Sequence, residues 1–409
     1  MHSCRICQLK TLKVKIDFGL QPVSNRYLFA PDQDEFKYHF QLGCCSFCGL
    51  VQLINPPPFD ELKPKLSWIN YSEPENHLDE MVDLITKLPG VTLSSNFYGL
   101  GQYEDSTLER LKNKGFNNVA RLKVDTETNI CNSFTIIETI HRYSQHKNLH
   151  KLIHDNKHPQ VIIARDILEH AQDPLLFMRM LREMISPDGY VIFEVPDYTK
   201  TFMSCDYSSL WEEHITYFSS FTFIQSLKFG GFSVEALKVY PYDSQDYLVA
   251  VARPNIFSKD NEVDSINQDE LKKEKKRFYH YSSHVLGRKS WYRDVLSKYR
   301  KRGKIALMGA GHLACHFINL MKVSDLIDFI IDDHPNKKGM LMPGSQLPIF
   351  DSSALEDPEI KLCLLSLSQS SERKVLLKNK AFIDKGGRFA SIFPASSIAL
   401  MPSKDEVEF

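Results

Sequence analysis

The sequence lacks three features that are typical of membrane proteins, of proteins that bind polyanions and of exported proteins. It contains no run of about 18 apolar residues, which a transmembrane helix needs. It has no surplus of one charge, because 50 Lys and Arg stand against 51 Asp and Glu, so no overall field attracts nucleic acid or an anionic membrane. The first residues, MHSCRICQLKTLKVKIDF, lack the apolar centre of a signal peptide. We therefore expect a cytoplasmic protein that binds neither nucleic acid nor membranes.

The cysteine content does not resemble that of a secreted disulfide framework. Nine cysteines are few for 409 residues, and five of them fall within the first 48. Such clustering favours a metal site in a reducing compartment. The chain is 43% hydrophobic and longer than a single core usually allows, so we expect two or three compact units.

The N-terminal third of the chain predicts a small lobe and a connecting helix. Residues 1–60 contain Cys, Pro and short β-prone runs. They have too few apolar residues to form a stable lobe without a cross-link such as a bound metal ion. Residues 61–90 are predicted to be helical, because Leu78, Met81 and Ile85 share one face.

Two α/β units are predicted beyond this helix. In residues 91–254, short apolar strands alternate with helical segments, which indicates a parallel sheet. Its last two strands, 233–240 and 247–252, are separated by a turn too short for a crossover and must pair antiparallel. A sheet that closes in this way has the topology of class I methyltransferases. Residues 255–303 are predicted to be a helical linker, and residues 304–409 a second, Rossmann-like α/β unit.

Two Cys-x2-Cys turns near the N-terminus predict a zinc site. The four sulfurs are those of Cys4, Cys7, Cys45 and Cys48. Two such turns complete a tetrahedral thiolate shell, which leaves no position open for water, so we expect a structural ion that stabilises the lobe. Two alternatives remain open, a register that uses Cys44 and four incidental free thiols.

A glycine turn near residue 100 is a candidate cofactor loop. Gly99 and Gly101 lie between a β-prone run and a helical segment, where a cofactor can approach the backbone. Asp125, some 24 positions later, is a candidate partner for ribose hydroxyls. A simple tight turn and a solvated loop are the competing interpretations of these residues.

Titratable residues gather after two predicted strands, at the edge of the sheet where ligands bind. Asp166, Glu169 and His170 follow the apolar run 161–164, and either face cofactor or substrate or cap the next helix.

Glu213 and His214 follow the next strand, where carboxylates beside an imidazole suit a base that removes a proton next to a carbonyl. Trp211 and Tyr217 could exclude water or stack on a sugar. The alternative is an amphipathic turn that holds a core histidine.

The second α/β unit opens with a dinucleotide-type pattern. Gly309, Gly311 and Ala314 follow the predicted strand 304–308, and Asp332 follows the next strand about 20 residues later. The pattern fits an NAD site, a turn that packs helix on strand, or a site for the phosphates of another nucleotide.

Taken together, these pieces resemble the zinc-containing sugar C-methyltransferases, which act on nucleotide-linked sugars and form branched deoxysugars. The resemblance covers nearly the whole chain. It rests on Cys45-Ser-Phe-Cys48-Gly-Leu-Val-Gln-Leu53, Trp68-Ile-Asn-Tyr71, Leu168-Glu-His170, Phe193-Glu-Val-Pro196, Glu213-His214, Tyr217-Phe-Ser219, Gly309-Ala-Gly311, Asp332-Asp333 and Pro343-Gly344.

The resemblance implies an S-adenosylmethionine-dependent enzyme that methylates a nucleotide-linked 4-keto-sugar through an enolate. By this analogy His214 is the base, Glu213 orients or polarises, and Tyr71 and His170 help to bind the ketone or enolate. The C-terminal unit, with Gly309 and Gly311, would help to enclose the sugar nucleotide. We expect a monomer or a small homo-oligomer.

The chain departs from the family pattern at two places. Trp211 and Glu212 stand where the family has Tyr and His, and the loop from Tyr98 to Gln102 lacks the pattern Glu-x-Gly-x-Asn-Asp-Gly. Two rival hypotheses follow. The chain could be an NAD-binding sugar-nucleotide enzyme, or a decayed methyltransferase that serves as a binding or scaffold protein.

Overall fold

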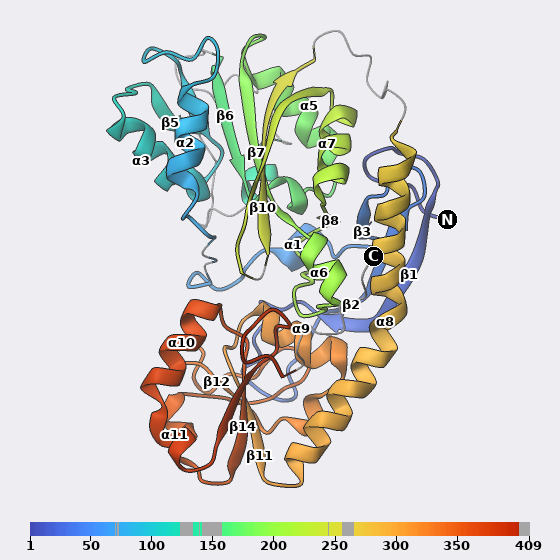
Figure 1. Ribbon diagram of the computed structural model, residues 1–409, viewed down its shortest axis with the longest axis vertical. Coiled ribbons are helices and arrows are strands. Elements are labelled where there is room, and N and C mark those ends of the chain that lie inside the picture. Colours follow the sequence, from blue (N-terminus) through green and yellow to red (C-terminus); the bar gives the residue numbers. More distant parts are fainter. Residues whose placement is uncertain are drawn as a thin grey trace.

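Three β-sheets organise the residues described by the computed structural model, which are 1–69, 71, 73–122, 134–138, 140, 158–243, 245–255 and 266–400. Figure 1 shows two α/β units, one above the other, with the N-terminal strands beside the junction and one long helix running along both units. No helix among the described residues combines the length and apolar character needed to cross a bilayer.

The N-terminal sheet is built from two distant parts of the chain. Its order is β1-β2-β3-β8, and every neighbouring pair is antiparallel. The strands are β1 (Leu12–Pro22), β2 (Lys37–Cys45), β3 (Val51–Leu53) and β8 (Thr216–Tyr217). Since β8 belongs to the segment that follows His214, the N-terminal lobe and the middle of the chain share one sheet.

The central sheet has the order β5-β4-β6-β7-β10-β9 and is parallel except for β10, which is antiparallel to both of its neighbours. The hairpin predicted at its end is thereby confirmed. Its strands are β4 (Phe97–Gly99), β5 (Val119–Arg121), β6 (Val161–Arg165), β7 (Tyr190–Asp197), β9 (Phe232–Tyr240) and β10 (Asp246–Pro254).

Helices cover both faces of this sheet, which explains why its inner strands are apolar throughout. Along β6, Val161 and Ile163 pack into one apolar cluster and Ile162 and Ala164 into another, as alternation requires. The first cluster includes α2 (Leu78–Thr86) and α3 (Asp105–Asn113), and the second includes α5 (Pro174–Met184) and α7 (Ser220–Phe229).

The expectation of one connecting helix over residues 61–90 is wrong. The structure has α1 (Phe59–Leu62) and α2 instead, and the segment between them contains Pro64 and Pro74. Each proline lacks a backbone N–H and disfavours a helical residue before it, so a continuous helix cannot form there.

The linker helix α8 (Gln268–Arg300) spans 33 residues and runs beside both α/β units (Figure 1). Its first turn is capped by Asn267, whose side chain accepts from the backbone N–H groups of Asp269 and Glu270. Phe278 and Tyr281 are buried against the central part of the molecule, and Leu296 is buried near the C-terminal unit.

The C-terminal sheet has the order β13-β12-β11-β14-β15 and is parallel throughout. Its strands are β11 (Lys304–Met308), β12 (Phe329–Ile331), β13 (Ile349–Phe350), β14 (Ile360–Leu365) and β15 (Arg388–Ser391). Its helices are α9 (His312–Met321), α10 (Gln369–Lys378) and α11 (Lys380–Asp384).

The carboxyl edges of the two parallel sheets face a common cavity. Asp166 and Pro196, at the ends of β6 and β7, line it from one side, while His312 and Leu367, after β11 and β14, line it from the other. Open α/β sheets bind ligands at this edge, so the fold places two such edges around one space.

Candidate active site and zinc centre

The four cysteines of the two knuckles converge as a zinc site requires. Their Sγ atoms lie within 4.8 Å of one another and all four residues are buried. Cys4 and Cys48 are 3.7 Å apart, and Cys7 and Cys45 are 3.6 Å apart, measured between sulfurs. A tetrahedron with zinc–sulfur bonds of about 2.3 Å has edges of about 3.8 Å, so the donor set fits the ion closely.

The surroundings of the sulfurs also suit bound thiolates. The side-chain amide of Gln52 donates to Cys4 Sγ over 3.1 Å, and the Thr11 hydroxyl lies 3.0 Å from Cys45 Sγ. Donors of this kind orient and stabilise metal-bound sulfur. Cys44 lies outside the cluster, because its thiol contacts the carbonyl of Gly49 instead, so the alternative register does not occur.

The shared cavity has a volume of about 370 Å³. Among the predicted site residues, Tyr71, Asp166, Glu169, His170, Trp211 and His214 line it. Other lining residues are Glu73, Pro74, Pro196, Tyr198, Ser209, Gln245, Tyr247, His312, Leu313, Leu367, Ser368, Gln369, Phe393 and Ala395. Contributions come from both α/β units and from the segment before α2, so the space is closed only when all three are assembled.

His214 is held in place through one ring nitrogen. Its Nδ1 lies 2.5 Å from the hydroxyl of Tyr198, which follows β7. Burial keeps the pKa of His214 well below its usual value, so the imidazole is neutral. In the tautomer whose Nδ1–H donates to Tyr198, Nε2 carries the free lone pair.

His170 is fixed in a similar way. Its Nδ1 lies 2.9 Å from the backbone carbonyl of Glu213, which can only accept, so Nδ1 carries the proton. Burial lowers the pKa of His170 to about 3. The rings of His170 and His214 meet edge to face with centroids 4.8 Å apart, so two neutral imidazoles share one wall of the cavity.

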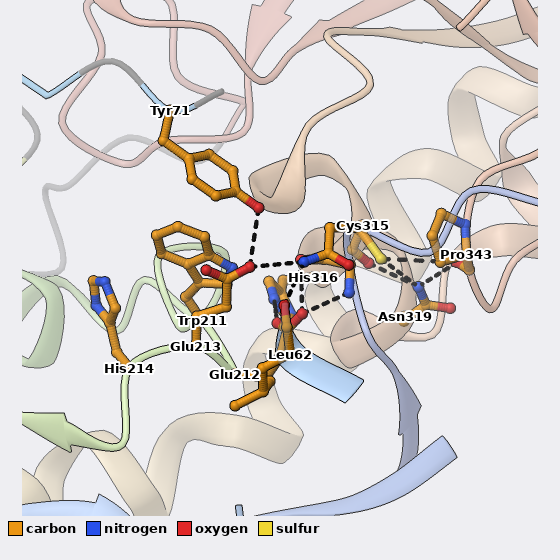
Figure 2. A network of polar contacts seen from close by, with 12 residues as sticks. Leu62, Tyr71, Trp211, Glu212, Glu213, His214, Cys315, His316, Asn319 and Pro343 are labelled. Carbon is orange, nitrogen blue, oxygen red and sulfur yellow. Dashed lines mark hydrogen bonds and ion pairs between the residues drawn. The ribbon is translucent and has the colours of Figure 1, made fainter. Parts of the chain in front are cut away.

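The adjacent carboxyl groups of Glu212 and Glu213 have opposite environments (Figure 2). Although burial alone would raise the pKa of Glu212, the charge of His316 and hydrogen bonds from His316 and Ser24 hold it below its usual value. His316 Nε2 lies 2.6 Å from Glu212, and Ser24 donates through both its backbone N–H and its hydroxyl.

Glu213, in contrast, has a pKa raised well above the usual value by burial and by the charge of Glu212. Tyr71 donates its hydroxyl to this carboxyl over 2.9 Å, and Asn25 donates its side-chain amide over 2.9 Å. The two glutamates therefore join the N-terminal lobe, the central loop and α9 into one polar network, with a neutral acid beside a charged one.

Buried carboxyl groups gather on the central side of the cavity. Burial raises the pKa of Glu73, and it raises the pKa of Asp166 and Glu169 well above their usual values. Both carboxyl oxygens of Glu169 are buried without a hydrogen-bond partner. An acidic, desolvated wall of this kind suits a cationic ligand. One oxygen of Glu169 and one ring nitrogen each of His170 and His214 also lie within 4.8 Å of one another, a donor set that could hold a divalent cation.

The C-terminal unit contributes His312, a residue absent from the predicted site. Its ring stacks on Trp211, with centroids 4.3 Å apart and an interplanar angle of 15°. His312 begins α9 directly after the Gly309–Gly311 turn, at the carboxyl end of β11. Asp166 was predicted because it follows a strand of a parallel sheet, and the same rule applied to β11 would have identified His312. Tyr198 and Glu73 were missed as well, because neither belongs to a recognisable motif.

The glycine loop is filled by the chain itself. A Cβ on Gly99 would meet Glu104 at 2.6 Å, and one on Gly101 would meet Ile136 at 2.1 Å. The N–H of Gly101 donates to the buried carboxyl of Glu104, whose pKa burial raises to about 7. The following residues, Gln102, Tyr103, Asp105 and Ser106, line an open cavity of about 520 Å³ together with Tyr71, Glu73, Glu75 and Arg165. Asp125 lies outside the described residues.

Tyr217 does not line the cavity. Its hydroxyl donates to the carbonyl of Trp211 over 2.8 Å, and its ring packs edge-on against Tyr198 within β8. The structure therefore contradicts the expected substrate contact, because pairing of β8 with β3 turns this side chain into the buried core. Tyr217 supports the loop that presents Trp211.

The dinucleotide-type pattern is used for internal contacts. Gly309 has a φ of 102°, and a Cβ there would meet the Ser366 hydroxyl at 2.7 Å. Gly311 has open space around it and precedes α9. One carboxyl oxygen of Asp332 accepts from the N–H of Ala310 and from Lys337, and the other accepts from the N–H of His334. Three of the about four acceptor positions of the Asp332 carboxylate are therefore taken by contacts within the chain.

Comparisons with known proteins match successive parts of the chain. A zinc binding domain matches residues 4–62, a methyltransferase domain residues 101–237, and a C-methyltransferase C-terminal domain residues 247–394. The C-methyltransferase NovU of Streptomyces niveus is 21% identical over 415 residues, covering 96% of each chain.

Solved structures resemble a part of the chain. The 1,6-didemethyltoxoflavin-N1-methyltransferase of Burkholderia thailandensis, bound to S-adenosylhomocysteine and 1,6-didemethyltoxoflavin, is 12% identical with a TM-score of 0.31, covering 44% of this chain and 79% of that one. An S-adenosylmethionine-dependent methyltransferase from Clostridium acetobutylicum is 10% identical with a TM-score of 0.30, covering 46% of this chain and 93% of that one.

The central sheet, with its strand order and terminal antiparallel strand, defines a class I methyltransferase. The cysteine cluster lies before this sheet in the chain, and the region that matches a C-methyltransferase C-terminal domain lies after it. Together the three matches and this relative support a zinc-containing C-methyltransferase.

Proposed function

We propose that this enzyme transfers a methyl group from S-adenosylmethionine to the carbon beside the ketone of a nucleotide-linked 4-keto-deoxysugar. The observation that carries the proposal is His214, a neutral imidazole fixed by Tyr198 at the wall of the shared cavity. A base of this kind can remove the proton next to a carbonyl, which leaves a nucleophilic enolate.

The acidic wall supports the choice of methyl donor. S-adenosylmethionine carries a sulfonium and an ammonium group, and it supplies an activated methyl group that needs no further catalysis by metal or acid. Glu73, Asp166 and Glu169 present buried carboxyl groups to the cavity, an arrangement that favours a cationic ligand. The loop residues Gln102 and Tyr103 border the adjoining open cavity, where the rest of the donor would extend.

The residues around His214 have distinct roles in this proposal. His214 Nε2 takes the proton, and the neutral ring of His170 helps to bind the ketone or enolate oxygen. Tyr71 lines the cavity, and its hydroxyl donates to the carboxyl of Glu213, which fixes the ring beside the substrate. Glu213 holds Tyr71, and through its backbone carbonyl it also orients His170. Holding the enolate carbon in line with the methyl group supplies most of the rate gain.

The sugar and its nucleotide fit the other wall. Trp211 and His312 form a stacked aromatic pair that can contact a sugar ring and exclude water. Gly309 and Gly311 begin the C-terminal side, where Ser368 and Gln369 also line the cavity. In this proposal the C-terminal unit binds the nucleotide-linked part of the substrate.

The direct test is to incubate the protein with S-adenosylmethionine and a panel of nucleotide-linked keto-sugars, with mass spectrometry of the products. A mass increase of one methyl group on a 4-keto sugar supports the proposal, and deuterium exchange next to the ketone in the absence of donor would identify the enolate step. Methylation of non-sugar ketones alone would contradict the sugar assignment.

Two other functions make different predictions. An NAD-dependent enzyme would bind NADH tightly and S-adenosylmethionine not at all in calorimetry. The contacts of Asp332 with Ala310, His334 and Lys337 speak against it, because they already use most of the acceptor capacity of this carboxylate. A scaffold without catalysis would methylate no sugar, and His214→Ala would have no consequence in cells.

A further inference from the structure

A second group of metal-binding side chains lies far from the cysteine knuckles along the sequence, where α6 (Thr199–Ser204) packs on α8. One ligand atom each of Cys205, His280 and His284 falls within 4.8 Å of the other two. The two histidines are one helical turn apart on α8, and their ring centroids are 4.2 Å apart. Histidines at i and i+4 present their rings on one helix face, an arrangement used in metal sites.

Both imidazoles are oriented by the backbone. His284 Nδ1 lies 2.8 Å from the backbone carbonyl of His280, and the ring of His280 is hydrogen-bonded to the backbone of Met203. A carbonyl only accepts, so Nδ1 of His284 carries the proton and its Nε2 keeps a lone pair. Metal-ligating histidines commonly have this outer contact to a carbonyl, because it fixes the tautomer and the ring orientation.

The third ligand is the thiol of Cys205, at the C-terminal end of α6. Cys205 ends α6 with a φ of 51° and is only 3% exposed. Burial raises the pKa of the thiol, while the nearby guanidinium of Arg288 opposes this rise. Arg288 also donates to the carbonyl of Ser204, so the end of α6 is already attached to α8. A divalent ion would displace the thiol proton to solvent and gain a thiolate ligand.

The framework around these three residues is rigid. The hydroxyl of Tyr207 donates to the backbone carbonyl of Tyr281 over 2.6 Å, and that of Tyr281 donates to the carbonyl of Asp206 over 3.0 Å. Phe202 and Tyr281 pack with ring centroids 5.0 Å apart. Ligands held on packed elements keep their geometry without the ion, which favours binding.

We propose that Cys205, His280 and His284 bind a second zinc ion. One thiolate and two imidazoles suit a borderline-soft divalent ion, and since His284 is exposed, the fourth position is taken by water. The ion joins the end of α6 to the helix that connects the two α/β units. It thereby anchors the segment that begins at Cys205 and leads to His214.

Zinc content measured on the untagged, full-length protein tests this assignment. After dialysis against a weak chelator, mass spectrometry of the metal should find two zinc ions per chain in the wild type. The double variant His280→Ala, His284→Ala should keep one, and circular dichroism should show an intact fold, since His280 is half-buried and His284 is exposed. As a control, His39→Ala changes an exposed histidine on β2 and should keep two.

Titration of zinc into protein that retains only the cysteine-bound ion measures the affinity of the second site. His284→Ala should weaken binding of the second ion by at least about 100-fold, because changes in the outer shell alone cost 10–100-fold. One zinc ion in the wild type would overturn the assignment. A second ion that persists in the double variant would also overturn the assignment. If that ion is lost in Glu169→Ala, its site is the cluster of Glu169, His170 and His214. Methyl transfer is not used as a readout, so the outcome is independent of the proposed reaction.

Discussion

The buried pair of Glu212 and His316 makes a quantitative prediction about how the three parts of the enzyme are held together. The carboxyl of Glu212 is fully buried, the ring of His316 is 2% exposed, and the closest atoms are 2.6 Å apart. Removing one partner of a buried pair costs about 3–5 kcal/mol, because the other charge is left without compensation. In His316→Ala the two hydrogen bonds from Ser24 remain, so we expect a loss of about 3 kcal/mol, the lower end of that range.

A double-mutant cycle separates this interaction from changes in packing. Glu212→Gln keeps an acceptor for Ser24 but removes the charge, so its effect should be smaller, about 1 kcal/mol. The double variant should lose less than the sum of the two single effects, with a coupling energy of about 2 kcal/mol. Arg293→Ala is the matched control, because the pair that Arg293 forms with Asp325 is exposed and contributes at most about 1 kcal/mol.

Urea unfolding followed by tryptophan fluorescence measures these differences, since Trp211 lies beside Glu212 and Trp291 lies on α8. The folded-state pKa of Glu212 is lowered, so its stabilising effect is present above its usual value of 4.5 and is lost as the pH falls through the folded-state pKa. The wild type should therefore lose its advantage over His316→Ala only in acid. If His316→Ala is no less stable than Arg293→Ala at neutral pH, the reasoning fails.

Three further predictions concern catalysis and the zinc lobe. His214→Ala should reduce kcat by about 100-fold or more while S-adenosylmethionine still binds in calorimetry, and loss of donor binding would mean that its role is misassigned. Cys4→Ser with Cys7→Ser should unfold the N-terminal lobe and release its zinc, whereas less than one zinc ion per wild-type chain would refute the metal assignment. His312→Ala should raise KM for the proposed sugar substrate more than it lowers kcat, because its ring stacks on Trp211 at the cavity wall, and an unchanged KM would exclude it from the substrate site.

The sequence predicted those parts of the fold that depend on local pattern. The apolar runs at 161–164 and 190–195 became β6 and β7, and the short turn before Tyr247 forced the antiparallel pair of β9 and β10. The knuckles met because Cys-x2-Cys spacing fixes two sulfurs per turn, and pairing of β1 with β2 brings the two turns together. These features follow from chain stiffness and alternation alone.

The remaining features depend on contacts between distant elements. Glu104 contacts Gly101 three residues earlier, but its burial also depends on the N–H of Arg165 on β6, a partner that is set by sheet order. The stack of Trp211 on His312 requires the two α/β units to be docked, and their relative placement is not encoded in any motif. The sequence therefore predicted site residues of the central unit but did not predict His312, which the C-terminal unit contributes.

The pairing of β8 with β3 has a consequence for any attempt to divide this enzyme into parts. Thr216 pairs with Gln52 and Tyr217 with Val51, only two residues after His214. A fragment that starts beyond residue 60 would lose the strand on which this end of the loop rests. Exchange of the N-terminal lobe between relatives would in turn change the strand that supports the loop of His214. The zinc lobe and the methyl-transfer centre should thus be inherited, engineered and inactivated together.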